Sequence, residues 1–507
     1  MNFLRLQDYL LSVLFENEDI LAIDKPYGFN AHTNDSKIEH SDFIQDGLIE
    51  IYEKQLGRKL HIIHRLDQTT TGVMIFGKSV ESAKKYAEYF FNREVKKTYM
   101  FVTKFKSEKK QFTINQQIVH KAKELDAETE LEFVKKSESF ELWKALPHTG
   151  RNHQIRIHAK AAGISILGDS KYGGHNYDFL CLHNARIEFP NGIVILSKMP
   201  AYFEDLSLLN DIVIARAYFE ADRRLRLFSQ ASQNQSYRLS HNDQNFVLDQ
   251  FGEKIVVNWK KERWLESDSE KFSRFSKSLK KELVIQNVHS EATTKTWVAC
   301  EGELQFEMRS EAGQVSGLFL NQRLQRQWIL NNSENKSVLS LFSQVGTFSV
   351  AAAKGKASQI TSVDTSKKSL EWAKKNFELN QVTNEAYKFL NRDSLTFLEQ
   401  CKAKGQKFDL IICDAPGFFR REKGVFKIEN NLEELMKNCL VSLTDKGQLL
   451  FSTSFDALFV DDIRKIILKV TKELKIEKLE VNCILSSLDF ELPDEKVGLK
   501  SFLVGKI

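Results

Sequence analysis

In the C-terminal third of the chain, short apolar segments alternate with segments of helical periodicity, and this alternation is the strongest constraint on the fold. Val338–Phe342, Phe408–Cys413 and Gln448–Ser452 have the length of buried strands, whereas Ser366–Asn380 and Leu432–Leu443 place apolar residues on one face of a helix. Strands that alternate with amphipathic helices form a parallel sheet covered by helices. The sequence therefore predicts an α/β Rossmann-like domain here.

The first two hundred residues have a different pattern, in which short apolar runs are separated by turns. Examples are Asp19–Ile23, Val73–Phe76, Lys97–Thr103 and Glu130–Phe133. Such runs are typical of a strand-rich α+β domain with a mixed or antiparallel sheet.

A chain of 507 residues is too long for one compact core. Between the two parts, strand-like Phe246–Asp249 and Lys254–Asn258 precede a segment of helical spacing at 268–282. We expect a multidomain protein with an α+β domain at 1–210, a small α+β connecting domain at 211–312 and an α/β domain at 313–507.

The composition is that of a soluble globular protein and does not identify a function. A net charge of +5 is only mildly basic, so it does not by itself indicate a nucleic-acid partner. The sequence shows neither a signal peptide nor an apolar stretch long enough to span a bilayer. The cysteines are scattered without a C-x-x-C pair, which argues against a zinc or redox centre and favours a reducing cytoplasm; they are Cys181, Cys300, Cys401, Cys413, Cys439 and Cys483.

The most informative N-terminal segment is HIIHRLDQTTTG at 61–72, which places Asp67 in a turn before a strand. A carboxylate in such a turn suits covalent or acid–base chemistry, although an isolated Arg–Asp pair is more often a structural salt bridge. Three further segments favour a functional interpretation: DKPYG at 24–28, KKTY at 96–99 and GRNHQIRIH at 150–158.

With these motifs, residues 14–190 resemble the RluA-type pseudouridine synthases. The family signature HRLD-x-x-T-S-G appears as HRLDQTTTG with Thr71 in place of serine, and GRTHQIRVH appears as GRNHQIRIH with Asn152 in place of threonine. Both replacements keep a small polar side chain.

The resemblance implies roles for individual residues. Asp67 is expected to be the catalytic aspartate and Arg156 its salt-bridge partner, while Tyr99 stacks on the target base and Arg65 fills the space that the base leaves. The residues expected to form the active-site floor and the remaining substrate-binding surface are Lys25, Pro26, Lys97, Arg151 and His153. Further cations that suit phosphate binding are Arg93, Lys96, Lys104, Lys106, Lys109 and Lys110.

The chemistry implied by this family fits these residue types. The N1–C1′ bond of uridine breaks, the uracil rotates, and a C5–C1′ bond forms. An ionised carboxylate starts the reaction either by attacking the nucleoside or by assisting deprotonation, and an aromatic face holds the extruded base. No metal or organic cofactor is required for this half.

The C-terminal part carries a nucleoside-binding pattern. SLFSQVGTFSV at 340–350 indicates a strand, a glycine turn at Gly346 and a helix, and Asp364 ends the next strand. A glycine turn followed by an acid for ribose hydroxyls suits a nucleoside cofactor. Since the G-x-G-x-x-G pattern of dinucleotide sites is absent, S-adenosylmethionine fits better. Asp393 follows the third strand, and DAPG at 414–417 follows the fourth.

From about residue 215 onward, and most clearly over 314–418, the chain resembles class I methyltransferases of large-subunit ribosomal RNA, of the RlmI and RlmKL kind. Their G-F-F-L-D-Q-R segment appears as GLFLNQR at 317–323, with Asn321 replacing the acid, and their V-D-x-S-x-x-x-L-E-W-A as VDTSKKSLEWA. Their D-P-P motif appears as D-A-P. The cofactor-binding residues that this resemblance implies are Gln322, Phe342, Gly346, Asp364, Asp393 and Asp414.

Methylation of cytosine at C5 in this family needs a cysteine nucleophile near the D-P-P or T-C-S-type segments, and this chain has none there. DAPG at 414–417 and FSTS at 451–454 contain none, and we expect Cys413 to lie in the core of a strand. This favours a base nitrogen or another acceptor.

Together these observations predict a cytoplasmic, bifunctional enzyme that acts on RNA, with ribosomal RNA as the favoured class. One alternative is a monofunctional pseudouridine synthase whose degenerate methyltransferase module serves as an RNA-binding platform. Another is a methyltransferase for a protein or small molecule with an inactive N-terminal half.

Overall fold

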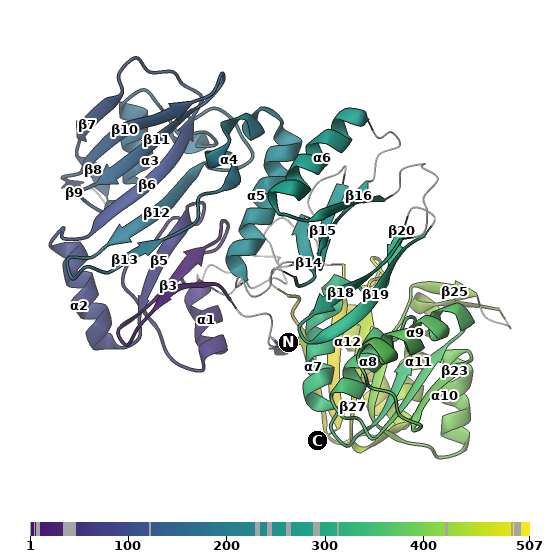
Figure 1. The fold of residues 1–507 in the computed structure, drawn as a ribbon. Helices are drawn as coiled ribbons and strands as arrows, with labels where there is room; N and C mark the ends of the chain where they lie inside the picture. Colours follow the sequence, from purple (N-terminus) through teal and green to yellow (C-terminus); the bar gives the residue numbers. More distant parts are fainter. Residues whose placement is uncertain are drawn as a thin grey trace. The chain divides into compact units, whose positions relative to one another are not determined.

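The computed structural model shows two compact units, each described here by itself (Figure 1). One comprises Met1–Asp8, Gln233–Trp264 and Lys281–Ile507, and the other comprises Tyr9–Ser232 and Leu265–Lys280. The predicted connecting segment 211–312 contributes residues to both. The structure describes every residue of the chain except 1, 5, 7–10, 34–46, 121–122, 229–233, 241–245, 260–264, 287–294, 312–313, 421–423, 488–489, 491–497 and 507.

The unit that contains Asp67 is built on a large mixed sheet. Its main path runs in the order β2 (Val13–Glu16), β3 (Ile20–Lys25), β5 (Thr71–Gly77), β12 (Leu182–Glu188), β6 (Lys96–Thr103), β11 (Glu141–Pro147), β10 (Glu128–Lys136) and β7 (Gln111–Asn115). Neighbours are antiparallel except β5 and β12, which are parallel. The mixed, mostly antiparallel sheet confirms the predicted α+β class. Further strands of this unit are β4 (His61–Ile62), β8 (Ile118–His120), β9 (Lys123–Leu125) and β13 (Val194–Leu196).

Two hydrophobic clusters fix the helices on this sheet. Tyr86 of α2 (Val80–Phe91) packs with Val73 and Ile75 of β5, and Ala159 of α3 (Gln154–Ala161) packs with Trp143 of β11. These contacts hold α2 and α3 against the sheet and so fix where the end of α2 and the start of α3 lie. The other helices that the structure describes in this unit are α1 (Leu48–Leu56), η1 (Ser170–Tyr172), α4 (Ala201–Glu204), η2 (Leu206–Asn210), α5 (Ile212–Leu227) and α6 (Glu266–Ser278).

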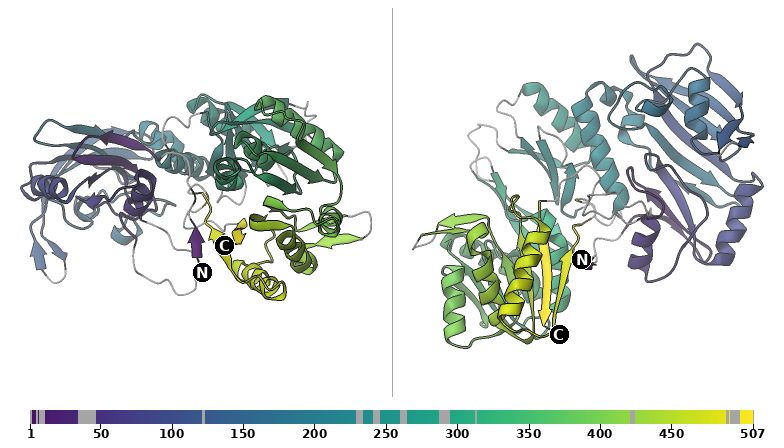
Figure 2. Two further views of the ribbon diagram at one scale, coloured as in Figure 1. Left: turned by 90° about the horizontal axis from the view of Figure 1, so that it is seen from below. Right: turned by 180° about the vertical axis from the view of Figure 1, so that it is seen from behind.

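The other unit contains an eight-stranded sheet in which parallel strands follow a doubly wound order. The order is β1 (Asn2–Leu4), β28 (Leu479–Ile484), β29 (Lys500–Lys506), β27 (Leu443–Thr453), β24 (Phe408–Asp414), β21 (Ser337–Leu341), β22 (Gln359–Asp364) and β23 (Tyr387–Asn391). β29 is antiparallel to both of its neighbours. The N-terminal strand β1 pairs in parallel with β28, so the start of the chain lies beside its C-terminal strands (Figure 2).

Alternate residues of the central strands point to opposite faces, and a separate hydrophobic cluster covers each face. Leu339 and Ile411 join the cluster under α10 (Ser394–Ala403), α11 (Ile428–Val441) and α12 (Val460–Glu473). Val338 and Leu410 join the cluster under α7 (Arg323–Asn332), α8 (Thr347–Lys354) and α9 (Lys367–Leu379). Helices on both faces confirm the predicted Rossmann-like architecture.

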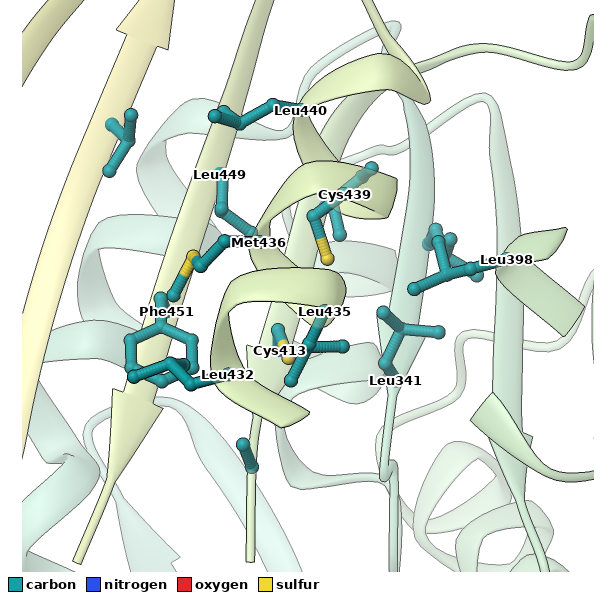
Figure 3. Packing of buried hydrophobic residues seen from close by; sticks show 14 of the residues in the cluster. Leu341, Leu398, Cys413, Leu432, Leu435, Met436, Cys439, Leu440, Leu449 and Phe451 are labelled. Carbon is teal, nitrogen blue, oxygen red and sulfur yellow. The ribbon is translucent and has the colours of Figure 1, made fainter. Parts of the chain in front are cut away.

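Cys413 lies inside the first of these clusters (Figure 3). Its side chain sits between Leu435 and Cys439 of α11 and strand residues such as Leu341, and only 1% of the residue is exposed. Burial raises the pKa of the Cys413 thiol well above its usual value. The predicted core role of this cysteine is confirmed.

The same unit also contains smaller sheets. A four-stranded sheet contains β14 (Tyr237–Ser240), β15 (Phe246–Phe251), β16 (Lys254–Trp259) and β17 (Glu282–Gln286), and a three-stranded sheet contains β18 (Lys295–Glu301), β19 (Leu304–Glu311) and β20 (Gln314–Ser316). The hairpin β25 (Phe418–Arg420) and β26 (Val425–Lys427) follows Asp414, and η4 (Leu320–Gln322) precedes α7.

One predicted element boundary is wrong. Helical spacing suggested a helix over 268–282, but α6 ends at Ser278 and Glu282 already begins β17. Lys280 adopts a left-handed φ of 55°, which ends the helix before the apparent periodicity does. Among the described residues, none of the helices is both long enough and apolar enough to cross a membrane.

Candidate functional sites

Asp67 lies in a turn between β4 and β5, and a buried lysine donates hydrogen bonds to the backbone of this turn. The backbone carbonyl of Asp67 accepts a hydrogen bond from the backbone N–H of Thr70 at 3.0 Å. Lys25, at the end of β3, is fully buried and donates from Nζ to the carbonyls of Gln68 and Thr70 at 2.9 Å each, and to that of Pro26 at 3.1 Å. Burial lowers the pKa of Lys25 to about 7, and the nearby Asp67 opposes this lowering. Lys25 therefore supports the turn and lies beneath it.

The predicted partner of Asp67 is close to it. One terminal nitrogen of the Arg156 guanidinium, from α3, lies 3.5 Å from Oδ2 of Asp67. The other two guanidinium nitrogens donate to the two carboxylate oxygens of Asp169, at 2.8 Å each. The side chain of Asp169 has no solvent exposure, whereas that of Asp67 is 25% exposed. Asp169 thus orients the guanidinium, and Asp67 stays accessible.

His153 approaches Asp67 from the start of the same helix. Its Nε2 lies 3.8 Å from Oδ2 of Asp67, and its Nδ1 lies 2.8 Å from the hydroxyl of Tyr172. The residue immediately precedes α3 and has a left-handed φ of 56°. Burial lowers the pKa of His153, Asp67 and Asp169 raise it, and Arg156 and Lys171 lower it further.

A pocket of about 830 Å³ opens beside Asp67 and is large enough for a nucleoside. Its lining combines aromatic, cationic and polar side chains, and the predicted site residues among them are Arg65, Asp67, Lys97, Tyr99, Arg151, His153 and Arg156. Burial, together with the charge of Asp67, raises the pKa of Tyr99 well above its usual value, so its phenol stays protonated. A second pocket of about 440 Å³ shares Asp67 and Arg156 and is lined by Asn30, His32, Gln68 and Thr69, among others.

The cations of the pocket are held in different ways. Lys97 donates from Nζ to the carbonyl of Thr149 at 2.9 Å, and burial lowers its pKa to about 8. Arg151 donates from Nε to the carbonyl of Asp126 at 3.0 Å, whereas Arg65 is exposed. Arg93 joins the lining of the larger pocket.

Several residues predicted for this site lie outside the two pockets. Neither Lys25 nor Pro26 belongs to the lining of either pocket. Lys96 pairs with Glu188 at 3.2 Å and Lys110 with Glu141 at 3.7 Å. None of the lysines at 104–110 belongs to the lining of either pocket.

Three residues in this site received no role from the sequence. Asp169 and Tyr172 belong to the GDSKYG segment at 168–173, whose spacing gave no sign that it returns to α3. Phe91, the last residue of α2, lines the larger pocket although 86% of the residue is exposed. A pair of phenylalanines at a helix end is a weak signal, because it equally suits a core position.

In the other unit, the predicted cofactor residues follow successive strands of one parallel sheet. Gly346 follows β21, Asp364 ends β22, Asp393 follows β23 and Asp414 ends β24. Since β21 pairs in parallel with both β22 and β24, these residues meet at the carboxyl edge where the order of the strands reverses. Such an edge is where doubly wound sheets bind their ligands.

The backbone of the turn after β21 adopts left-handed conformations, and Asp364 accepts hydrogen bonds beside it. Phe342, Gln344 and Gly346 have left-handed φ values of 53°, 47° and 77°. One carboxylate oxygen of Asp364 accepts from the backbone of Gln344 and the other from that of Ser366, at 2.8 Å each. A Cβ on Gly346 would lie 2.7 Å from that of Ala373. The backbone therefore comes close to α9, and only glycine fits.

Asp414 is hydrogen-bonded to Gln322, which is another of the predicted cofactor-binding residues. Nε2 of Gln322, from η4, donates to Oδ1 of Asp414 at 2.8 Å. Burial raises the pKa of Asp414 to about 6, although the Gln322 hydrogen bond and Arg326 lower it. Asp393 is the N-cap of α10, and its side chain accepts a hydrogen bond from the backbone N–H of Thr396 at 2.8 Å. The backbone of Phe342 donates to Ser394 at 3.2 Å, which brings the first and third of these strand ends together.

Comparison with known proteins finds two family models that match separate parts of the chain. Residues 19–161 match the family model described as RNA pseudouridylate synthase, and residues 277–504 match that of S-adenosylmethionine-dependent methyltransferase. Ribosomal RNA large subunit methyltransferase K/L of Pseudoalteromonas translucida is 38% identical over 150 residues, which are 29% of this chain and 21% of that protein. The chain thus spans about a fifth of the length of this relative.

Two further similarities concern the separate halves. A Haemophilus influenzae protein named uncharacterized RNA pseudouridine synthase is 29% identical over 205 residues, covering 38% of this chain and 88% of that protein. The solved structure of SMU.776 complexed with SAH has a TM-score of 0.51 at 22% identity, and the match covers 64% of this chain and 88% of that one. The latter likeness concerns the fold. One chain thus joins a part related to RNA pseudouridylate synthases to a part related to S-adenosylmethionine-dependent methyltransferases.

Proposed function

We propose that this protein is a bifunctional RNA-modifying enzyme. It converts uridine to pseudouridine in the Asp67 pocket and transfers a methyl group from S-adenosylmethionine to an RNA base at the sheet edge that carries Asp414. The observation that carries the first activity is the partly exposed Asp67 carboxylate, 3.5 Å from the Arg156 guanidinium, in a pocket lined by Tyr99. Ribosomal RNA is the proposed substrate class, by analogy with the named methyltransferase relative.

In the first reaction Asp67 is the catalytic carboxylate. Arg156 supplies its counter-charge and is itself fixed by Asp169, so the acid can act without rearrangement of its partner. Either attack on the ribose or assistance in its deprotonation begins with this ionised group. The phenol of Tyr99 offers an aromatic face for the detached uracil, which must rotate before C5 can bond to C1′.

The RNA around the target is proposed to bind at the rim of the pocket. Phe91 is a large exposed aromatic residue, and an unpaired base can stack on it. Arg65, Arg93 and Arg151 supply positive charge around the same opening, which suits phosphate groups. Because a target nucleotide must leave its stack to reach Asp67, an aromatic rim with cations beside it suits unpaired RNA.

The residues at the second site fit S-adenosylmethionine. The glycine turn at Gly346 leaves no room for a side chain, and acids follow the next strands, as a nucleoside with ribose hydroxyls requires. Gln322, Phe342, Gly346, Asp364, Asp393 and Asp414 would hold the cofactor, which supplies an electrophilic methyl group when bound. Asp414 and Gln322 would orient the acceptor base through hydrogen bonds.

The acceptor is proposed to be a base nitrogen. Methylation at cytosine C5 needs a thiolate nucleophile, but the thiol next to Asp414, that of Cys413, is buried in the core under α11. A carboxylate at the end of β24 can accept a hydrogen bond from an N–H group of the acceptor base and so suits nitrogen methylation.

Both activities can be tested with the full-length protein. Isolated ribosomal RNA and tRNA are incubated with the protein and labelled S-adenosylmethionine, and pseudouridine and methylated nucleotides are mapped by mass spectrometry. Pseudouridine that disappears in Asp67→Asn and methylation that disappears in Asp414→Asn support the proposal. Absence of S-adenosylmethionine binding in a calorimetric titration would instead favour an RNA-binding platform. Pseudouridine formation that persists in Asp67→Asn would overturn the first site.

A further inference from the structure

Isomerisation of uridine leaves one proton that must move, and the proposed roles so far provide no group to move it. The substrate carries hydrogen on C5 and the product carries it on N1. Once the C5–C1′ bond has formed, the uracil ring has an N1=C6 double bond and still holds the C5 hydrogen. A base within reach of the nucleoside beside Asp67 is therefore required. This inference rests on the proposed pseudouridine synthase activity.

The imidazole of His153 lies beside the catalytic carboxylate. Nε2 is 3.8 Å from Oδ2 of Asp67, and the side chain lines both pockets beside that acid. Nδ1 lies 2.8 Å from the Tyr172 hydroxyl. If Nδ1–H donates to this oxygen, the lone pair of Nε2 faces Asp67 and the space for the nucleoside.

Tyr99, His64 and Lys97, which also line the larger pocket, are less suited to take this proton. Burial holds the pKa of the Tyr99 phenol well above its usual value, so it cannot accept a proton. Nε2 of His64 accepts a hydrogen bond from the backbone of Ile75 at 3.2 Å, and burial lowers its pKa to about 3. Lys97 donates to the carbonyl of Thr149, which uses its amino group as a donor.

The local structure also favours a neutral imidazole at this position. His153 precedes the first turn of α3, and the positive end of a helix dipole disfavours a cation there. Arg156 and Lys171 lower its pKa in addition to burial, and Asp67 and Asp169 only partly oppose them. The left-handed φ of 56° is uncommon outside glycine, and conformations of this kind cluster at functional sites.

We propose that His153 transfers this proton. Nε2 takes the proton from C5, the electron pair of the C5–H bond forms the C5=C6 double bond, and the π pair of N1=C6 moves to N1. The imidazolium then delivers a proton to N1, which restores neutral His153 and completes the isomerisation without a co-reactant. Tyr172 is the positioning residue that orients the ring.

The test compares His153→Gln with His175→Gln, a matched control whose histidine is exposed and lines neither pocket. Full-length proteins are assayed on RNA that contains either uridine or 5-deuterouridine at the modified position. We expect His153→Gln to slow pseudouridine formation about 10²- to 10⁴-fold, as for loss of a general base, and the control to be unaffected. Deuterium at C5 should slow the variant further than it slows the native protein, because removal of that proton becomes rate-limiting.

The isotope comparison separates chemistry from folding, since a merely structural role would slow both RNAs equally. Equal rates on the two RNAs in His153→Gln, or an isotope effect that appears in Lys97→Met instead, would overturn this inference. Native protein that forms no pseudouridine at all would overturn the proposed function itself. Thermal unfolding of each variant shows whether the slower rate reflects a folded protein.

Discussion

Asp169 receives two hydrogen bonds from Arg156, at 2.8 Å each, whereas the same guanidinium stays 3.5 Å from Asp67. The strong bidentate pair is thus made with the buried carboxylate and not with the one in the pocket. Asp169 is held in turn by the backbone N–H of Tyr172, at 3.2 Å. This arrangement fixes the position of the positive charge while Asp67 keeps an accessible oxygen.

The first prediction is that Asp169→Asn slows pseudouridine formation with little effect on KM. The amide can accept only one of the two hydrogen bonds from Arg156, so the guanidinium loses its fixed orientation. Misplacement of a catalytic partner by about 1 Å costs about 10²-fold in rate, and we expect a fall of up to that size in kcat. Single-turnover kinetics on a modified-site RNA measures it.

Ser170→Ala is the control for this variant because Ser170 is exposed and adjacent. Its rate should equal that of the native protein. Unchanged kcat in Asp169→Asn would show that Asp67 does not depend on the orientation of Arg156.

The second prediction is that Phe91→Ala raises KM for RNA and leaves kcat unchanged. Stacking of a base on an aromatic side chain contributes about 1–3 kcal/mol, which corresponds to about 5- to 150-fold in KM. Since 86% of Phe91 is exposed, its removal should not alter thermal stability. Val80→Ala is the matched control, because Val80 is 62% exposed at the other end of α2 and does not line the pocket. Equal KM values for the two variants would contradict the stacking role.

The contrast between Asp67 and Asp169 shows what the sequence could predict. Asp67 and Arg156 lie in segments whose order and spacing resemble a known family, so their approach could be expected from the two motifs. The pairing of Arg156 with Asp169 depends on how residues 168–173 return to α3, and this path leaves no periodic signal. Lys25 was expected at the site, but only the structure shows that its ammonium is buried under the turn and bonded to carbonyls.

The same holds for the fold. Strand and helix alternation predicted the parallel sheet because the periods of 2.0 and 3.6 residues are local properties of the sequence. The pairing of β1 with β28 joins residues 2–4 to residues 482–484, and a strand of three residues has no detectable period. The end of α6 was missed because Lys280 takes a left-handed conformation that its residue type does not indicate.

The third prediction concerns the glycine turn after β21. Gly346→Ala should abolish detectable binding of S-adenosylmethionine and destabilise its unit by about 2–4 kcal/mol, from the left-handed backbone and the contact with Ala373. Gly405→Ala is the matched control, since Gly405 has a φ of 64° but no atom within 4 Å of the added Cβ. The control should bear the backbone cost alone and bind the cofactor normally. Calorimetric titration and thermal unfolding measure the two effects, and normal binding by Gly346→Ala would exclude this turn as the cofactor site.

The fourth prediction is that Asp414→Asn abolishes methyl transfer but stabilises the protein at neutral pH. The folded-state pKa of about 6 lies above the ordinary 3.8, so the ionised carboxylate costs free energy in the folded protein. This cost is absent at pH values below the unfolded-state pKa, grows as the pH rises, and is complete above about pH 6. The full difference corresponds to at most about 3 kcal/mol, and partial solvent access of the half-buried side chain lowers the expected gain to about 1–2 kcal/mol.

Thermal unfolding of Asp414→Asn and the native protein should therefore differ at pH 7.5 and coincide near pH 4. Methyl transfer by the native protein should rise with pH through about 6, as Asp414 ionises and becomes able to accept a hydrogen bond from the acceptor base. Gln322→Glu offers a second check, because a negative charge 2.8 Å from Asp414 should move the rise in activity to higher pH. A pH profile that stays flat between 5 and 8 in both proteins would show that ionisation of Asp414 has no part in the reaction, because about 10% of the carboxyl groups would be ionised at the lower limit and nearly all at the upper.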